Sequence, residues 1–393
     1  MAKRAIVLGG GMVGSVMACD LARNGEFEVT LADRSQHSLA AAQARAGRLG
    51  VGPLTTVEAD LSDPQNIARL VSDQDVVLGA IASHLGYGAL EAVAGSGKPF
   101  ADISFMPEDA LELDAVAKKS GSCCVVDCGV APGMSNLLAG WGHARLERTD
   151  KIEIYVGGLP VVRTQPFEYK AGFAPSDVIE EYTRPSRVVE NSQIVVKEAL
   201  TEAEPLEFAG LGTLEAFNTD GLRSLVRTLD VPNMVEKTMR YPGHAALMAA
   251  FRAAGLFSKE PVKVNGQMVV PLELTSRVLF PKWTYEDGEE DLTVMRVEVT
   301  GELGGKQTAL RWDLADRYSQ AEGATSMSRT TALPCTSVAR LLLGGTFTQP
   351  GVHPPETLGA IPGMPERILA SLAERGVQFS FEEITVAQPR ALD

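Results

Sequence analysis

The sequence has no apolar run near the ~18 residues that a membrane-spanning helix needs, so we expect no transmembrane segment. Cysteine is scarce, with 5 residues in a chain of 393, which argues against a disulfide framework and favours a reducing cytoplasm. The first predicted strand begins close to the start of the chain, so we expect no secretory signal. Internal repeats and low-complexity tracts are also missing.

Positive charge is in the minority as well. The chain has 36 Lys and Arg against 50 Asp and Glu, a formal net charge of −14. This acidity disfavours nucleic acid and anionic membrane surfaces as partners. The rest is ordinary for a globular protein, with 45% hydrophobic residues, 22% charged residues and enough length for two domains.

The most informative stretch is a glycine-rich turn near the start. Residues Ala5–Leu8 form an apolar run typical of a strand buried on both faces. Gly9, Gly11 and Gly14 follow with the spacing Gly-x-Gly-x-x-Gly, and a helix is predicted over 15–24. The first glycine permits a tight turn, the second lets a pyrophosphate approach the main chain, and the third lets helix and strand pack closely. The pattern predicts a dinucleotide site at the helix start; the alternative is a turn that binds nothing.

An acidic residue at the end of the second predicted strand indicates which dinucleotide the site binds. Strand Phe27–Ala32 stops at Asp33, about 20 positions after the last glycine. A carboxylate there binds the adenosine ribose and repels a 2′-phosphate, which favours NAD over NADP. Arg34 weakens this preference, because its guanidinium could reach such a phosphate. We predict NAD as the cofactor, with NADP second.

Residues 1–130 keep the strand–helix alternation of a Rossmann-type, doubly wound parallel sheet, in which ligands bind beyond the carboxyl ends of the strands. Further strands are expected at 54–60, 75–80, 98–103 and 123–127, with a helix at 64–72. The glycine turn and the strand ends supply the predicted cofactor contacts, which are Gly9, Gly11, Met12, Val13, Gly14, Asp33, Arg34, Asp60, Leu61, Ala80, Ile81 and Cys128.

After residue 130 the pattern changes to strands joined by hairpins and mixed with helices. This predicts an inserted α+β domain with a mostly antiparallel sheet over residues 131–325. Residues 326–393 are expected to return to the first domain through an apolar helix, 330–343, and to end in a small helix–strand unit, 365–387. The inserted domain should contain a strand at 151–156, hairpins at 187–197 and 291–313, and helices at 176–183, 221–229 and 245–254.

One candidate for chemistry lies in the first predicted domain. Asp102 is near the carboxyl end of the strand predicted over 98–103, where such sheets bind ligands. A carboxylate there can bind an amine or move a proton; the alternative is a residue that caps a helix or loop. Cys123 and Cys124 are assigned to packing, since no Cys-x-x-Cys or nearby His completes a zinc site, and no metal is predicted.

The inserted domain carries four more catalytic candidates. Thr219 or Asp220 can cap a helix that carries Arg223, whose guanidinium could clamp a carboxylate. The alternative for Arg223 is a surface ion pair with Asp220. His244 opens a predicted helix and could serve as acid, base or carboxylate partner, or could simply cap or pack. Tyr169 ends another predicted strand.

The glycine turn and five later segments together carry a family resemblance. These segments are 7–14, 127–136, 156–160, 179–185, 215–224 and 240–244. On them the chain resembles the saccharopine dehydrogenase-like enzymes, and most closely the lysine 6-dehydrogenases, over nearly its whole length. One departure is Cys128, where a small residue such as Ala is expected in lysine dehydrogenases.

The resemblance implies a two-domain enzyme, usually a homodimer, that binds a small amino-acid substrate between its domains. The implied reaction is oxidation of the ε-amine of L-lysine by NAD to 2-aminoadipate 6-semialdehyde, which cyclises, with release of ammonia. Arg223 or His244 would hold the α-carboxylate. Asp102 would lie near the amine and accept its proton.

Three other functions stay open at this point. One is the formation or oxidation of saccharopine or carboxynorspermidine by an enzyme of the same family. Another is a non-catalytic sensor that binds the dinucleotide. The third is a hydride-transfer enzyme with a tightly held cofactor that acts on a carbonyl or sugar substrate.

Overall fold

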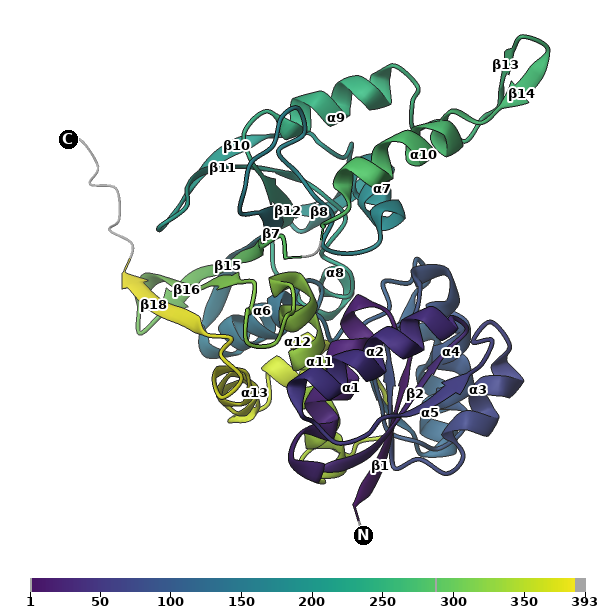
Figure 1. Ribbon diagram of the computed structural model, residues 1–393. Helices are drawn as coiled ribbons and strands as arrows, with labels where there is room; N and C mark the ends of the chain where they lie inside the picture. The colour runs from purple at the N-terminus through teal and green to yellow at the C-terminus, as the bar shows by residue number, and fades with distance from the viewer. Residues whose placement is uncertain (1, 287, 386–393) are drawn as a thin grey trace. The chain divides into compact units, whose positions relative to one another are not determined.

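The computed structural model describes residues 2–286 and 288–385, which form two compact units (Figure 1). The first unit combines the chain up to Trp141 with Ser328–Gln378, and the second combines Gly142–Met327 with the chain from Phe379. The chain thus enters the second unit, returns to the first and ends in the second. Within the described residues, no helix has the length and hydropathy needed to cross a membrane.

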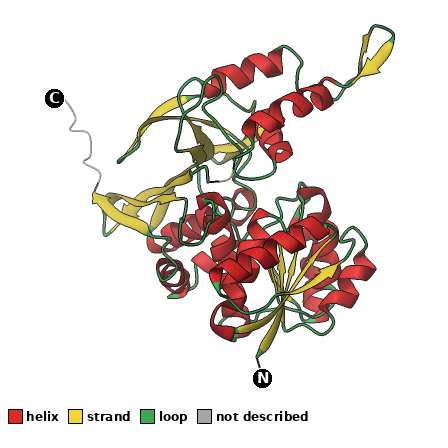
Figure 2. Cartoon of the chain, in the orientation of Figure 1, coloured by secondary structure: helices red, strands yellow, loops and turns green. Residues whose placement is uncertain are grey.

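The first unit is built on a parallel sheet of seven strands in the order β17-β6-β5-β4-β1-β2-β3. Helices lie on both sides of this sheet (Figure 2), so its central strands are buried on both faces. The predicted doubly wound sheet is confirmed, and β17 extends it beyond β6. The strands are β1 (Lys3–Leu8), β2 (Phe27–Asp33), β3 (Thr55–Glu58), β4 (Val76–Gly79), β5 (Phe100–Asp102), β6 (Cys123–Val125) and β17 (Gly351–His353).

The helices of the first unit begin and end at recognisable local signals. Helix α2 (Gln36–Leu49) starts after Ser35, whose hydroxyl caps it, and ends at Gly50 in the left-handed conformation. Helix α3 (Pro64–Val71) starts after the capping residue Asp63. The others are α1 (Met12–Ala22), η1 (Arg23–Gly25), α4 (Ser83–Ala94), η2 (Ala110–Leu113), α5 (Asp114–Ser120), α6 (Met134–Arg145), α11 (Ser326–Leu343), α12 (Pro355–Gly359) and α13 (Met364–Ala373).

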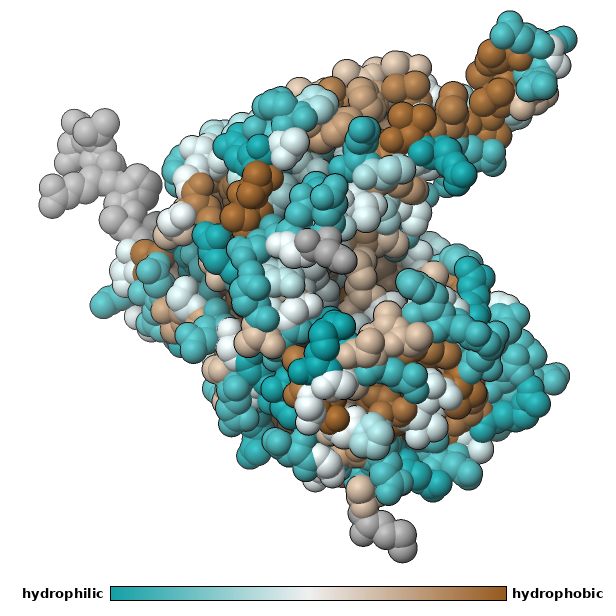
Figure 3. Space-filling model, viewed as in Figure 1, coloured by the Kyte–Doolittle hydropathy of each residue, from teal (hydrophilic) through white to brown (hydrophobic). Residues whose placement is uncertain are grey.

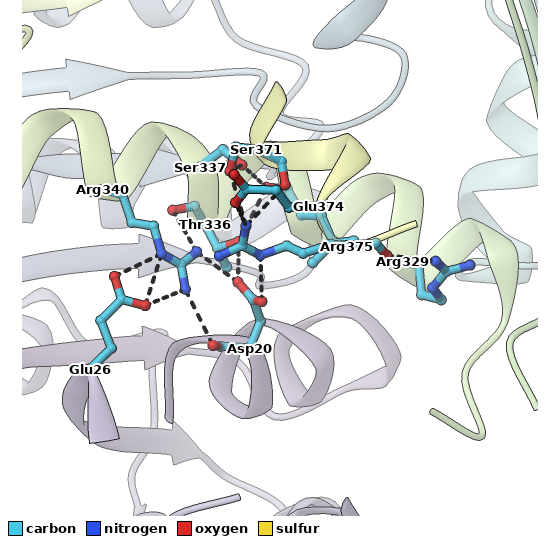
Figure 4. Close-up of polar contacts among 10 residues, drawn as sticks. Asp20, Glu26, Arg329, Thr336, Ser337, Arg340, Ser371, Glu374 and Arg375 are labelled. Atoms are coloured by element: carbon cyan, nitrogen blue, oxygen red, sulfur yellow. Dashed lines mark hydrogen bonds and ion pairs between the residues drawn. The ribbon is translucent and has the colours of Figure 1, made fainter. Parts of the chain in front are cut away.

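A buried carboxylate fastens α1 to the returning part of the chain (Figure 4). Asp20 of α1 accepts hydrogen bonds of 2.7 Å from Thr336 and Arg340 of α11 and from Arg375, which follows α13. Arg340 also pairs with Glu26 at 2.8 Å. The helix that begins at the glycine turn is thus held by residues more than three hundred positions further along the chain.

The second unit has a nine-stranded mixed sheet in the order β10-β11-β12-β7-β15-β16-β18, with β8 paired to β12 and β9. Only the β12–β7 pair is parallel among the described strands of this sheet, so the predicted mostly antiparallel sheet is confirmed. The predicted hairpin over 291–313 is present, and its turn residues Gly304 and Gly305 both have the positive φ that a tight turn requires.

The strands of this sheet are β7 (Arg148–Pro160), β8 (Ser186–Glu190), β9 (Gln193–Lys197), β10 (Glu204–Phe208), β11 (Gly212–Asn218), β12 (Met234–Arg240), β15 (Asp291–Leu303), β16 (Lys306–Arg317) and β18 (Phe379–Thr385). The helices of the unit are α7 (Pro175–Thr183), α8 (Leu225–Thr228), α9 (His244–Ala253) and α10 (Pro271–Trp283). A separate two-stranded sheet consists of β13 (Val262–Val264) and β14 (Gln267–Val269).

The end of the chain differs from the small helix–strand unit that the sequence predicted. Helix α13 belongs to the first unit, whereas β18 pairs antiparallel with β16 of the second. Local sequence pattern cannot show which sheet a strand will join, and this accounts for the difference. The division between the units falls after residues 141 and 327, compared with predicted boundaries at 130 and 325. Residues 386 and 387, the end of the predicted unit, lie outside the described residues.

Candidate active site

The glycine turn has the geometry of a phosphate cradle. Gly9 has φ +103°, and a Cβ added there would lie 2.3 Å from the carbonyl oxygen of Ala80. A Cβ at Gly14 would lie 1.9 Å from the carbonyl oxygen of Gly9, so both glycines are required by close packing. A Cβ at Gly11, in contrast, would meet no atom within 4 Å. The open face at Gly11 is where a pyrophosphate can approach the main chain, so these residues fit a dinucleotide.

The first turn of α1 adds main-chain donors to this cradle. Gly11 is the N-cap residue of α1 and makes no side-chain cap, so the amides of the first turn keep their capacity to bind an anion. The side chain of Met12 is half exposed and that of Val13 is partly exposed. Both residues therefore lie at the accessible rim of the turn.

Asp33 lies beside the glycine turn at the end of β2. Its Oδ2 accepts a 2.6 Å hydrogen bond from the amide of Gly10, and its Oδ1 accepts one of 2.7 Å from the amide of Ser35. The carboxylate is thus held at the edge where the adenosine ribose of a dinucleotide binds. Arg34 is exposed. Hydrogen bonds from Ser62 lower the pKa of Asp60, and the charge of Arg34 adds to this effect.

Three more of the predicted cofactor contacts at strand ends have different surroundings. Ala80 continues β4 past its end, since its amide donates to the carbonyl of Leu8, and Ile81 packs partly on the core. The side chain of Leu61, however, is buried in the hydrophobic core. Leu61 could therefore touch a cofactor only through its main chain, and its predicted role as a cofactor contact stays a prediction.

Asp102 is a buried carboxylate at the end of β5. Its side chain is 1% exposed and lies directly over Gly79, where an added Cβ would come within 2.0 Å of Oδ1. Ser104 donates a 2.7 Å hydrogen bond to Oδ1, while Oδ2 has no hydrogen-bond partner within the described chain. Burial raises the pKa of Asp102 to about 6, and the charge of Asp127 contributes to the rise. A carboxylate with this pKa can take up and release a proton near neutral pH.

Cys128 lies next to this carboxylate rather than on an open edge. Its amide donates a 2.8 Å hydrogen bond to the carbonyl of Asp102, and its thiol donates to the carbonyl of Val125 at 3.3 Å. The residue is 3% exposed, and burial raises the pKa of its thiol well above the usual range. Cys128 is therefore a neutral thiol that packs beside Asp102, and it is no thiolate nucleophile.

In the second unit a buried arginine organises a polar and aromatic cluster. Arg240, at the end of β12, donates to Glu181 of α7 at 2.9 Å and to the carbonyl of Met239. Its guanidinium lies 4.6 Å from the ring centre of Tyr169, within cation–π range. The sequence predicted a role only for His244 within the segment 240–244. Strand β12 also carries Glu236, Lys237 and Thr238, so its sequence held no signal that set Arg240 apart.

His244 is held inside the same cluster. Its Nδ1 lies 2.9 Å from the carbonyl oxygen of Phe167, and its Nε2 lies 2.9 Å from the hydroxyl of Tyr182. Burial, together with the charge of Arg240, lowers the pKa of His244 to about 3. The imidazole is therefore neutral near pH 7, where it donates through Nδ1 and accepts from Tyr182, so the predicted role as an acid or base is corrected to a packing role.

Thr219 belongs to a second buried polar group in this unit. Its hydroxyl donates to Glu236 Oε2 at 2.7 Å and contacts the hydroxyl of Thr238 at 2.9 Å. Burial raises the pKa of Glu236 to about 8, and the neighbouring charges of Glu181 and Asp220 act in the same direction. Glu236 therefore carries a proton at neutral pH.

The surroundings of Arg223 differ from the predicted helix start. The predicted helix 221–229 is reduced to the single turn α8, and Arg223 precedes it with φ +53°. Asp220 pairs with Arg187 at 2.9 Å, and the predicted alternative of an Asp220–Arg223 pair stays a prediction. Among the predicted catalytic residues, Tyr169 and His244 have ring centres 5.0 Å apart in the second unit, and Asp102 belongs to the first.

The doubly wound sheet, the open glycine turn and the buried carboxylate at a neighbouring strand end define a dinucleotide-dependent oxidoreductase. Residues 5–125 match the saccharopine dehydrogenase NADP binding domain, and residues 129–377 match the saccharopine dehydrogenase C-terminal domain. The chain belongs to the saccharopine dehydrogenase family.

Two curated relatives match nearly the whole of the chain. The saccharopine dehydrogenase (NADP(+), L-glutamate-forming) of Schizosaccharomyces pombe is 22% identical over 96% of this chain and 98% of its own length. The protein of the same name from Saccharomyces cerevisiae is 20% identical over 90% and 94%. The solved structure of the apo S. cerevisiae saccharopine dehydrogenase (L-Glu forming) has a TM-score of 0.79, with 18% identity over 98% of this chain and all of that one.

The family resemblance seen in the sequence is thereby confirmed, and so is the prediction of an amino-acid dehydrogenase that acts on CH–NH donors. The narrower resemblance to the lysine 6-dehydrogenases stays a prediction.

Proposed function

We propose that this protein oxidises the bond between the ε-carbon and the nitrogen of a lysine-derived amine, with saccharopine as the first candidate substrate. Saccharopine is favoured because relatives that match over nearly their whole length bear the name saccharopine dehydrogenase. Oxidation of the C–N bond gives an imine; addition of water and cleavage then release L-glutamate and leave 2-aminoadipate 6-semialdehyde. The observation that carries the proposal is the buried, half-satisfied carboxylate of Asp102 at the end of β5.

The chemistry requires a base, because an ammonium ion cannot readily lose hydride from its carbon. Asp102 suits this role, since Oδ2 has an unused acceptor and the pKa of about 6 leaves the group mostly ionised above neutral pH. Ser104 fixes the carboxylate through Oδ1. Bound at the glycine turn, a nicotinamide dinucleotide would supply the hydride acceptor.

We propose NAD as the preferred dinucleotide, although both named relatives are NADP enzymes. The support is Asp33, whose carboxylate is fixed by two amides at the ribose edge of the cradle. A negative charge there repels the 2′-phosphate of NADP. The exposed Arg34 provides a residual capacity for NADP.

L-Lysine is the second candidate substrate. It is favoured by the motif resemblance to lysine 6-dehydrogenases, above all in segments 127–136 and 179–185. The same carboxylate would act as base, and only the leaving group differs, with ammonia released in place of L-glutamate. The Ala expected at position 128 in lysine dehydrogenases is Cys128 here, which counts against L-lysine as the substrate.

The test is a substrate panel with the purified protein. Saccharopine, L-lysine and unrelated amino acids are each incubated with NAD and with NADP, and the reduced dinucleotide is followed by absorbance. We expect turnover of saccharopine, with L-glutamate found among the products. Turnover of L-lysine alone, with ammonia, would establish the second candidate. Dinucleotide binding without turnover of any amine would leave the non-catalytic sensor as the better account.

A further inference from the structure

The ribose edge of the glycine turn carries a second carboxylate besides that of Asp33. Parallel pairing of β2 with β3 sets Glu58, the last residue of β3, beside Asp33, the last residue of β2. Paired residues of neighbouring strands project to the same face of a sheet, so both acidic side chains leave the sheet on one side. The edge where the adenosine ribose of a dinucleotide binds is therefore flanked by two carboxylates.

Two hydrogen bonds fasten Glu58 and its strand to helix α2. Its Oε2 accepts a 2.5 Å hydrogen bond from Nε2 of Gln36, the first residue of α2. Two turns further along the same face of the helix, Nε2 of Gln43 donates to the hydroxyl of Thr56 at 3.1 Å. Thr56 and Glu58 are two positions apart in β3 and so share a face of the sheet. The carboxylate of Glu58 is thus held at the beginning of α2.

The beginning of α2 is also next to the place that the 2′-phosphate of NADP would take. In this fold the carboxylate at the end of the second strand binds the ribose 2′-hydroxyl, which the 2′-phosphate replaces. Gln36 follows Asp33 by only three positions, and the amide of Ser35 between them donates to that carboxylate. The first turn of α2 has no acidic residue of its own, so the helix start by itself would attract a phosphate. Glu58 supplies the negative charge that the helix lacks.

Negative charge predominates at this edge of the first unit. The strand ends carry three carboxylates, those of Asp33, Glu58 and Asp60, against the one guanidinium of Arg34. Hydrogen bonds from Ser62 lower the pKa of Asp60 and the charge of Arg34 adds to this effect, so Arg34 is partly neutralised by its neighbour. Figure 3 shows that hydrophilic residues cover much of the visible surface of this unit. A phosphate would therefore meet an excess of like charge, at an edge where salt can screen it.

We propose that Glu58 is a second determinant of dinucleotide specificity, which excludes the 2′-phosphate together with Asp33. The inference rests on the proposed preference for NAD and adds to it a residue from a different strand. Asp33 acts at the ribose hydroxyls, and Glu58 acts at the start of α2, where the phosphate would gain most from the helix. Removal of either carboxylate alone therefore leaves part of the discrimination in place.

The test measures binding of NADH and NADPH, which differ only in the 2′-phosphate, in the absence of any amine. The fluorescence of each reduced dinucleotide is titrated with the full chain, as wild type and as Glu58→Gln. The amide keeps the size of the side chain and can still accept from Gln36, but it has no charge. The Kd for NADPH should fall about three- to tenfold, while the Kd for NADH stays within about twofold. In about 0.5 M salt the gain for NADPH should shrink below about twofold, because exposed charges are screened.

The matched control is Glu28→Gln, which removes an exposed carboxylate from the same strand as Asp33. Glu28 lies five positions before Asp33, roughly 16 Å along the strand and beyond the screening length of about 8 Å at physiological salt. This variant should leave both binding constants unchanged. Unchanged NADPH binding in Glu58→Gln, an equal gain for NADH, or an equal gain in Glu28→Gln would overturn the role of Glu58. A wild type that binds NADPH more tightly than NADH would instead overturn the preference for NAD, and the inference with it.

Discussion

The hydroxyl of Ser104 donates a 2.7 Å hydrogen bond to Oδ1 of Asp102 and thereby holds a carboxylate whose other oxygen has no partner within the described chain. A buried acceptor without a partner is unusual, because burying an unsatisfied polar group costs about 1–3 kcal/mol. Such a cost is tolerated where the group has a chemical task. The pair of Ser104 and Asp102 is therefore the feature of the first unit that most directly supports the proposed activity.

Replacing Asp102 with Asn should abolish most turnover and leave dinucleotide binding intact. The amide has nearly the same shape but cannot accept a proton, so we expect kcat to fall by about 10²–10⁴-fold. Dinucleotide affinity is measured separately by fluorescence titration and should stay within a factor of a few. Wild-type turnover in Asp102→Asn would remove this carboxylate from the mechanism.

The pH profile should report the same group. With a pKa of about 6, Asp102 is ionised above that pH, so kcat/KM should fall as the pH drops below about 6. Hydrogen bonding from Ser104 favours the ionised form, so Ser104→Ala should raise the pKa and move the acid limb to higher pH. A purely structural role for Ser104 would lower activity at every pH without moving the limb.

Dinucleotide preference should depend on Asp33. In Asp33→Ser the negative charge that faces the ribose edge is gone while Arg34 remains, so the ratio of kcat/KM for NAD to that for NADP should fall at least about tenfold. The amide of Gly10 loses its carboxylate acceptor in this variant, so thermal stability is measured alongside. Reversion of the preference by the further change Arg34→Ala would show that the guanidinium holds the 2′-phosphate. If wild type already prefers NADP, the assignment of Asp33 is mistaken.

Local signals in the sequence predicted most of the first unit, because its strands are continuous apolar runs and its glycine turn has a fixed spacing. They also placed Asp102 correctly at a strand end. The pairing of Arg240 with Glu181 joins residues 59 positions apart, and only the folded chain shows it. Burial, with the charge of Arg240, accounts for the low pKa of His244, which in isolation would titrate near neutral pH. The burial of these side chains and their contacts with residues distant in the sequence could therefore not be predicted from the sequence.

Removing the carboxylate of Asp20 should destabilise the first unit. In Asp20→Asn the guanidinium groups of Arg340 and Arg375 lose their shared buried partner, at a cost of about 3–5 kcal/mol. The matched control is Lys118→Gln, which breaks an exposed pair with Asp114 and should cost only about 0.3–0.5 kcal/mol. Urea unfolding followed by circular dichroism measures both. Similar losses of unfolding free energy in the two variants would show that the buried ion pairs of Asp20 contribute no more to stability than an exposed pair does.

The charge on Asp20 should also contribute to stability in a pH-dependent way. Burial alone would raise its pKa, but Arg340, Arg375 and the hydrogen bond from Thr336 bring the pKa below the usual value. A carboxyl whose pKa is lower in the folded state contributes stability above its unfolded pKa, and this contribution is lost as the pH falls through the folded pKa. Acid unfolding of Asp20→Asn should therefore depend less steeply on pH than that of wild type below about pH 4.

Glu236 should show the opposite dependence. Its pKa in the folded protein is about 8, raised chiefly by burial, so the folded state keeps a proton that the unfolded chain releases near pH 4.5. Stability from this group is present below the unfolded pKa and is lost as the pH rises through the folded pKa, at up to about 1.4 kcal/mol per pH unit. Glu236→Gln has the same shape and can still accept from Thr219, but it has no proton to lose. Its melting temperature should match wild type near pH 5 and exceed it increasingly toward pH 8. Equal melting temperatures for the two proteins across this range would mean that Glu236 is ionised in the folded state, with a cation or solvent reaching it.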